Sequence, residues 1–199
     1  MSKDLLLKTF VMILFITLTT CMLNAQVCAF QEGKKPFMMI NIGTSMGINN
    51  VNYSNEYHNQ TTAMYEYGLN VNFPLKLKRL KPFAAGIDLR YGSNSGYASF
   101  EDEYSLIFIG GNLVIKPGPI VFLSYSPGVV LGDVKYIDGT KQSIKPQYSM
   151  RLSSGVELGN AGQTGVFLNH YHCKVNDNNI TSTTVGLFFD ARFNIFTKN

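Results

Sequence analysis

Apolar and polar residues alternate along most of the chain after residue 36. In the stretch MYEYGLNVNFPL at 64–75, every second residue from Tyr65 to Leu75 is apolar or aromatic, and the positions between them include Glu66, Gly68, Asn70 and Asn72. A period of two is that of a β-strand, whose successive side chains point to opposite faces. The stretch therefore predicts a strand with one apolar and one polar face.

The same alternation predicts eight strands in all, and no helix of useful length after the first 25 residues. The expected strands cover 37–48, 64–75, 83–91, about 104–116, about 120–131, 148–158, about 164–173 and 185–196. The fourth strand alternates less regularly, and a β-bulge is expected near Gly110 and Gly111.

The connections between these strands alternate in length. The long segments are polar and alternate along the chain with short links. The long segments are 49–63, 93–103, 132–147 and 174–182, and the short links are 76–82, 117–119 and 160–163. Long loops outside the cell and short periplasmic turns are typical of up-and-down barrels in the outer membrane. The sequence therefore predicts an all-β protein, an eight-stranded antiparallel transmembrane β-barrel.

Aromatic residues support the same topology because they are sorted by type. Tyr lies where the expected strands meet the long connections, and Phe where they meet the short ones: Tyr65, Tyr91, Tyr104, Tyr148 and Tyr171 against Phe37, Phe73, Phe83, Phe193 and Phe196. Aromatic girdles at the two membrane boundaries account for such sorting.

The polar faces of the expected strands carry charges of both signs. They are Glu66, Asp88, Arg90, Arg151, Glu157, Asp190 and Arg192. Eight strands enclose about enough room for side chains and no more, and buried charges require partners. We therefore expect a narrow interior filled by paired charges and not an open channel. The alternative to a membrane barrel is a soluble β-sandwich or a lipocalin-like cup.

Composition agrees with a membrane protein that is exported. Hydrophobic residues make up 45% of the chain and charged residues 15%, against about a quarter charged in soluble proteins. The net charge of +4 is too small and scattered to indicate a nucleic-acid partner. Residues 1–25 resemble a signal peptide with Lys3 and Lys8 before an apolar run. Residues 26–36 then form a periplasmic lead and 37–199 the barrel.

Two alternatives for the N-terminus are an uncleaved membrane anchor and lipidation at Cys21. Cleavage would leave Cys28 and Cys173 in the mature chain, and whether they pair stays open. No cofactor or metal site is expected.

One cluster has residues suited to chemistry. In LNHYHCK, His170 and His172 lie two apart on one face of the seventh expected strand, where they could bind a metal or transfer protons. The alternation of the strand places both side chains on the lipid-facing side near the outer boundary of the membrane. We therefore interpret them as polar residues at a strand end and not as a chemical site. GTSMG at 43–47 matches a hydrolase nucleophile motif but lies inside a continuing strand.

In architecture, residues 36–196 resemble the OmpA/OmpX-like small outer-membrane barrels. The resemblance rests on the strand number, the connections and the aromatic last strand VGLFFDARFNIF, although Thr197, Lys198 and Asn199 follow its last aromatic residue. The signal end LNAQ and the loops rich in Asn and Tyr resemble proteins of the Bacteroidetes. This resemblance implies a location in the bacterial outer membrane and identifies no ligand.

A narrower resemblance covers about 120–193 and concerns the lipid A deacylase barrels, which carry a His-x-Ser-Asn motif on the lipid-facing side of a late strand. His170 matches the histidine of that family, whereas His172 takes the place of the nucleophilic serine and Cys173 that of the asparagine. No carboxylate occupies Thr183 or Val185 on the next strand.

The sequence therefore favours a non-enzymatic outer-membrane barrel that is structural or binds at the cell surface. Its expected partners are outer-membrane lipid and lipopolysaccharide, with an extracellular ligand at loops 49–63 and 132–147. The alternative is a deacylase-like acyl hydrolase that uses His170 and His172. A passive pore is a third function class.

Overall fold

The computed structural model describes residues 36–53, 59–75, 83–94, 102–116, 120–159, 161–175 and 178–196. The expected signal peptide, nearly all of the lead 26–36, the short link 76–82 and Cys28 lie outside these ranges. No helix within the described ranges is long and apolar enough to cross a membrane.

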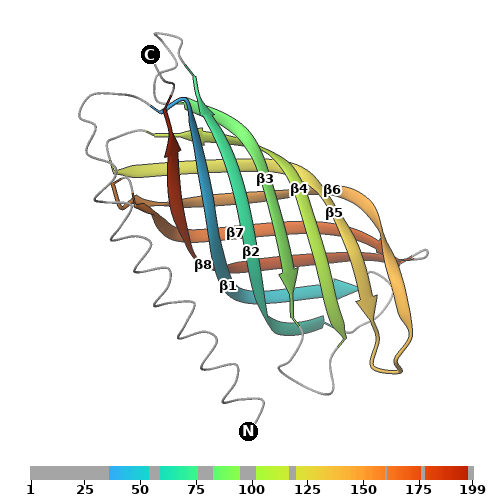
Figure 1. Ribbon diagram of the computed structural model, residues 1–199. Helices are drawn as coiled ribbons and strands as arrows, with labels where there is room; N and C mark the ends of the chain where they lie inside the picture. Colours follow the sequence, from blue (N-terminus) through green and yellow to red (C-terminus); the bar gives the residue numbers. More distant parts are fainter. Residues whose placement is uncertain are drawn as a thin grey trace, which may run out of the picture.

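Eight antiparallel strands close into one barrel, in which each strand pairs with its neighbours in sequence and β8 pairs with β1 (Figure 1). The strands are β1 (Met38–Tyr53), β2 (Asn59–Pro74), β3 (Phe83–Ser93), β4 (Glu103–Ile115), β5 (Val121–Lys135), β6 (Lys141–Glu157), β7 (Gly162–Val175) and β8 (Asn178–Ile195). This confirms the predicted fold class. We call the end with the four hairpins β1–β2, β3–β4, β5–β6 and β7–β8 the outer end, and the opposite end the inner end.

The phase of the strands is as the sequence predicts in the middle of the barrel. On β2, Glu66, Asn70 and Asn72 are buried, whereas Tyr67 and Leu69 are exposed. The same pattern on the other strands produces an outer wall of apolar side chains around a polar interior. A soluble sandwich or cup has the reverse arrangement, so this wall faces lipid.

Most strands are longer than predicted. The segments 49–63, 132–147 and 174–182, which we expected as loops, are largely strand, with β1 reaching Tyr53, β5 reaching Lys135 and β8 beginning at Asn178. The physical reason is that the inward positions become apolar and the outward positions become polar toward the outer end of the barrel, the reverse of the pattern in the membrane. Here Val51, Val134 and Ile144 are buried, while the alternate positions carry polar residues because they lie beyond the hydrocarbon part of the membrane, at the level of the head groups and the water outside.

The irregular positions also differ from the prediction. The pairing of β4 with β5 keeps one register on both sides of Gly110 and Gly111, so the expected bulge is absent there. Register shifts lie instead between Val130 and Gly132 in the β5–β6 pairing, and between Lys145 and Ser149 in the β6–β7 pairing. Gly132 has a φ of 145°, which glycine adopts at little cost. Pro146 has no N–H to give to a ladder.

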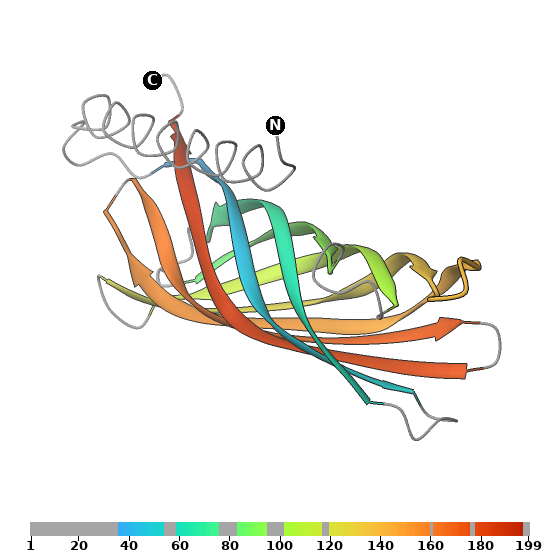
Figure 2. The same ribbon diagram turned by 90° about the horizontal axis from the view of Figure 1, so that it is seen from below.

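The outer end separates into two sheets. Pairing of β2 with β3 stops at Tyr65 and Ser93, and pairing of β6 with β7 stops at Ser149 and Tyr171 except for Lys145 with Lys174. Beyond these points β7, β8, β1 and β2 form one sheet and β4, β5 and β6 the other. Figure 2 shows the hairpins β1–β2, β5–β6 and β7–β8 running past the rest of the barrel.

Apolar side chains fill the barrel at both ends. The outer cluster, which lies between the two sheets, consists of Val51, Met64, Tyr104, Leu106, Phe108, Val130, Val134, Ile144, Tyr171, Cys173, Val175 and Ile180. The inner cluster consists of Met39, Ala84, Val114, Phe122, Phe167 and Phe188. Tyr104 and Tyr171, expected in the outer girdle, therefore point inward, because they are in phase with Leu106 and Cys173. Tyr67, Tyr91, Tyr125 and Tyr148 are exposed on the outer wall.

Candidate functional site

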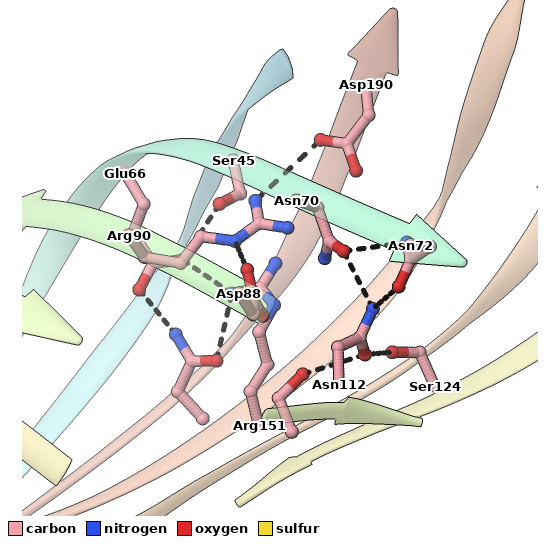
Figure 3. A network of polar contacts seen from close by, with 12 residues as sticks. Ser45, Glu66, Asn70, Asn72, Asp88, Arg90, Asn112, Ser124, Arg151 and Asp190 are labelled. Atoms are coloured by element: carbon pink, nitrogen blue, oxygen red, sulfur yellow. Dashed lines mark hydrogen bonds and ion pairs between the residues drawn. The ribbon is translucent and has the colours of Figure 1, made fainter. Parts of the chain in front are cut away.

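Polar side chains from several strands form a network in the barrel interior, and its first part is centred on Glu66 (Figure 3). The Glu66 carboxylate accepts hydrogen bonds from Ser45 (2.8 Å), Arg151 (2.6 Å) and Tyr171 (3.1 Å), and another from the side-chain amide of Asn169. These donors come from β1, β6 and β7, so one carboxylate joins strands across the interior. Charge-assisted hydrogen bonds of this kind are about twice as strong as neutral ones.

The Arg151 guanidinium is the counter-charge of Glu66 and is held in two further ways. Its Nη1 also donates to Asn169 Oδ1 (2.9 Å), and its Cζ lies 4.2 Å from the centroid of the Phe167 ring. The Nε and Nη2 atoms of Arg151 have no hydrogen-bond partner within the described part of the chain.

A second group of charges lies toward the inner end. Arg90 Nε donates to Asp88 Oδ1 (2.8 Å), and Arg90 Nη1 lies 3.7 Å from Asp190 Oδ1. A side chain at Gly68 would collide with the Arg90 guanidinium. Gly68 therefore provides the space in which Arg90 reaches from β3 toward Asp190 on β8 (Figure 3).

The second group continues through Gln163 to the inner rim. Gln163 donates to Asp190 Oδ2 (3.0 Å) and accepts from Arg192 Nη2 (2.8 Å). Arg192 Nη1 lies 2.8 Å and Lys116 Nζ 2.7 Å from Glu157 Oε1. Beside this group Asn112 bonds Asn70, Asn72, Ser124 and Ser126 in a cluster of amides and hydroxyls.

All seven charged residues that the sequence assigns to the interior lie there, but in two groups. Glu66 and Arg151 form the first, and Asp88, Arg90, Asp190, Arg192 and Glu157 belong to the second. With Lys116, these ion pairs join four acidic and four basic residues, so the charges balance. Lys116 was missed, although it is in phase with the inward Asn112 and Val114 and could have been found from the alternation.

His170 and His172 lie apart from this interior. Their rings are 4.6 Å apart at 90°, and His170 Nδ1 lies 3.0 Å from Thr183 Oγ1 on β8. Both are on the outward-facing side of β7. The alternate residues Cys173 and Val175 are buried in the outer cluster. Within the described ranges, no three His, Cys, Asp or Glu side chains are grouped to hold a metal ion.

The outward face near the hairpin ends carries cross-strand pairs. Lys135 lies 3.2 Å from Glu103, and Lys141 lies 2.9 Å from Asp133. The Tyr125 and Tyr148 hydroxyls are 2.7 Å apart, closer to the apolar wall. In the turn between β5 and β6, hydrogen bonds from the Thr140 hydroxyl and backbone N–H lower the pKa of Asp138.

Comparison with solved structures gives similarity in fold. Neisserial surface protein A (NspA) matches with a TM-score of 0.55 and 13% sequence identity, over 81% of this chain and 100% of that protein. Ail, the attachment invasion locus protein of Yersinia pestis, matches with a TM-score of 0.52 and 12% identity, over 78% of this chain and 98% of that one. No protein-family model and no curated protein sequence gives a match.

At these identities the likeness concerns the fold. Together with the closed barrel, the apolar wall and the charged interior, it shows that the chain has the fold of the small eight-stranded β-barrels of the bacterial outer membrane, with a wall suited to span that membrane.

Proposed function

We propose that the protein is a non-enzymatic surface barrel that binds an extracellular partner through the outer ends of its hairpins. The observation that carries this proposal is the length of the strands. A tilted strand needs about 9–11 residues to cross a membrane, whereas β1 and β2 have 16 each, β6 has 17 and β8 has 18. Strands of this length project beyond the lipid.

The projecting part has the construction of a rigid platform. Its two sheets enclose the outer apolar cluster, and its outward positions carry polar and paired charged residues. Binding surfaces are commonly built on such scaffolds. The names of the two similar proteins, a surface protein and an attachment protein, agree with a role at the cell surface.

Shortening the hairpins tests this proposal. Bacteria displaying the full-length barrel are incubated with an array of immobilised glycans and matrix proteins, and retention is measured. We expect retention that is lost when 133–143 is replaced by Asn-Gly, and also when 51–61 is replaced in the same way. His170→Ala should bind as the wild type does. Retention unchanged in both shortened variants, with all proteins folded by heat-modifiable gel shift, would contradict the proposal.

A deacylase-like acyl hydrolase is the second candidate, and the contact between His170 and Thr183 favours it. A histidine beside a hydroxyl on the lipid-facing wall is part of what an activated nucleophile needs. No carboxylate joins them in the described contacts. Incubation of the refolded barrel with lipid A, followed by mass spectrometry, tests this candidate. Acyl release that disappears in His170→Ala would replace the binding function by an enzymatic one.

The interior and the N-terminus complete the proposal. The balanced charges and the two apolar clusters support a plugged interior that does not conduct ions. Residues 1–25 are proposed to be removed as a signal peptide, which N-terminal sequencing of the mature protein would show. The LNAQ end and the loops rich in Asn and Tyr support an origin in the Bacteroidetes.

A further inference from the structure

Two lysines face each other across β6 and β7 at the outer end. Lys145 and Lys174 are register partners, and both point outward because their neighbours Ile144, Cys173 and Val175 are buried. Side chains directly opposite on antiparallel strands have Cβ atoms about 5 Å apart, and like charges in this position destabilise the pair.

Other lysines at this end are arranged differently. Lys135 lies opposite Glu103 and forms an ion pair with it, and Lys141 is paired with Asp133. Within the described residues, Lys145 and Lys174 form no ion pair with an acidic side chain. Lys145 and Lys174 therefore form a repulsive pair beside two compensated lysines, and an anion from outside the chain would neutralise it.

The position of the pair indicates the source of that anion. The outward residues of β7 change from Val166 and Leu168 to His170, then His172 and then Lys174. Lys174 lies about 13 Å along the strand beyond His170, at about 3.3 Å per residue. Tyr148 on β6 is exposed and is adjacent to Ser149, whose register partner on β7 is Tyr171. Tyrosine marks the level at which lipid head groups begin, so the lysines lie at head-group height.

We propose that Lys145 and Lys174, with the His172 imidazole beside them, bind the phosphate of a phosphorylated lipid head group in the outer leaflet. A phosphate monoester carries a charge of about −1.5 to −2 at neutral pH, which matches two ammonium groups. This inference goes beyond the proposed function, because it concerns a contact with membrane lipid and not the binding of an extracellular partner.

The test uses the full-length barrel refolded in detergent and titrated with bisphosphorylated lipid A, with binding read by native mass spectrometry. Lys145→Gln and Lys174→Gln should each weaken binding about fivefold, and the double variant about 25-fold, since each basic residue near a membrane surface contributes about 1 kcal/mol. The matched control, Lys135→Gln with Lys141→Gln, should change binding less than about twofold, since exposed ion pairs of this kind contribute little.

Three results would overturn the proposal. They are equal lipid binding by the wild type and the Lys145→Gln/Lys174→Gln variant, equal binding of lipid A from which the phosphates were removed, and displacement of lipid A by millimolar inorganic phosphate, which would indicate a site for a soluble anion. None of these three results changes the outcome of the retention assay on glycans and matrix proteins. Failure of the lipid-binding proposal can therefore be told apart from failure of the proposed function.

A charge reversal separates binding from folding. Lys145→Glu places an acid opposite Lys174, so the variant should unfold at a higher urea concentration than the wild type in the absence of lipid A, yet bind lipid A less. Lower stability together with wild-type binding would also overturn the proposal.

Discussion

At the residue scale, the interior depends on compensation of charge by specific partners. Glu66 holds donors from three strands, and Arg151 has its only described ion pair with Glu66. Both side chains are almost completely buried. Loss of one partner of a buried pair leaves an uncompensated charge, which is costlier than loss of both.

Glu66→Gln should therefore destabilise the barrel strongly. We expect a loss of about 3–5 kcal/mol in the free energy of unfolding, measured by urea unfolding in lipid vesicles. The control is Glu103→Gln, whose ion pair with Lys135 is exposed and contributes less than about 1 kcal/mol. Similar losses in the two variants would show that the interior pair contributes no more than a surface pair.

Alternation in the sequence predicts the face of a residue but not its partner. Asp190 and Arg192 are on one face of β8, two residues apart, yet Asp190 lies beside Arg90 and Gln163, and Arg192 beside Glu157. Barrel closure and tilt decide these neighbours. The face on which these residues lie could therefore be predicted from the sequence, whereas their partners could not.

At the element scale, β1 has two parts with opposite phase of polarity. On β1 the exposed residues change from Met46 and Ile48 to Asn50 and Asn52, while the buried ones change from Ser45 to Val51. The alternation is present in both parts, but the apolar residues change from the outward face to the inward face where the strand leaves the lipid. A strand prediction that requires the apolar residues to stay on one face therefore ends at this point. This is why the outer ends were predicted as loops.

The register shift in β5 should depend on Gly132. Its φ of 145° is unfavourable for other residues, and a Cβ there would collide with the Ser105 carbonyl oxygen. Gly132→Ala is expected to cost about 1–3 kcal/mol, measured by urea unfolding. Gly111→Ala is the control because a Cβ there meets no atom within 4 Å. A greater cost at Gly111 would contradict the observed position of the irregularity.

The turn between β5 and β6 should loosen in acid. The pKa of Asp138 is lowered by its hydrogen bonds with Thr140, so their stabilisation is present above the ordinary Asp pKa of about 3.9 and is lost as the pH falls through the lower folded value. The hydrogen-exchange protection of the Thr140 amide, corrected for intrinsic rates, should fall at that pH. The Gly139 amide, which donates to the Tyr136 carbonyl, should keep its protection better, and equal loss at both would indicate general unfolding.

At the scale of the whole molecule, buried side chains lie along the barrel interior from the outer end to the inner end. Below the outer cluster lies the pair of Glu66 and Arg151. Nearer the inner end the second charge group and the inner cluster lie side by side, because Gln163 and Asp190 are closer to that end than Phe167 and Phe188 on the same strands. The eight-stranded architecture could be predicted because lipid imposes a simple rule on every spanning strand. The outer apolar cluster could not, because it depends on the contact of two sheets distant in sequence.

A plugged interior, which we propose, should not conduct ions. Reconstituted in a planar bilayer, the barrel is expected to give no steady current at 100 mV, since eight strands enclose room for side chains only. The control is a multistranded porin inserted under the same conditions. A steady current from the refolded, heat-modifiable barrel would show a continuous water path past Arg151 and Arg90.

The seam between β1 and β8 has a consequence for how the molecule forms. It runs from Met38 with Ile195 to Tyr53 with Ile180 and joins the two ends of the barrel sequence. This pairing joins residues that are distant in sequence, so its contact order is high. The chain loses a large loop-closure entropy before the hydrogen bonds of the seam can form. The last strand must therefore reach the membrane before the first loses its open edge, and a chain interrupted before β8 would present two unpaired edges to any strand nearby.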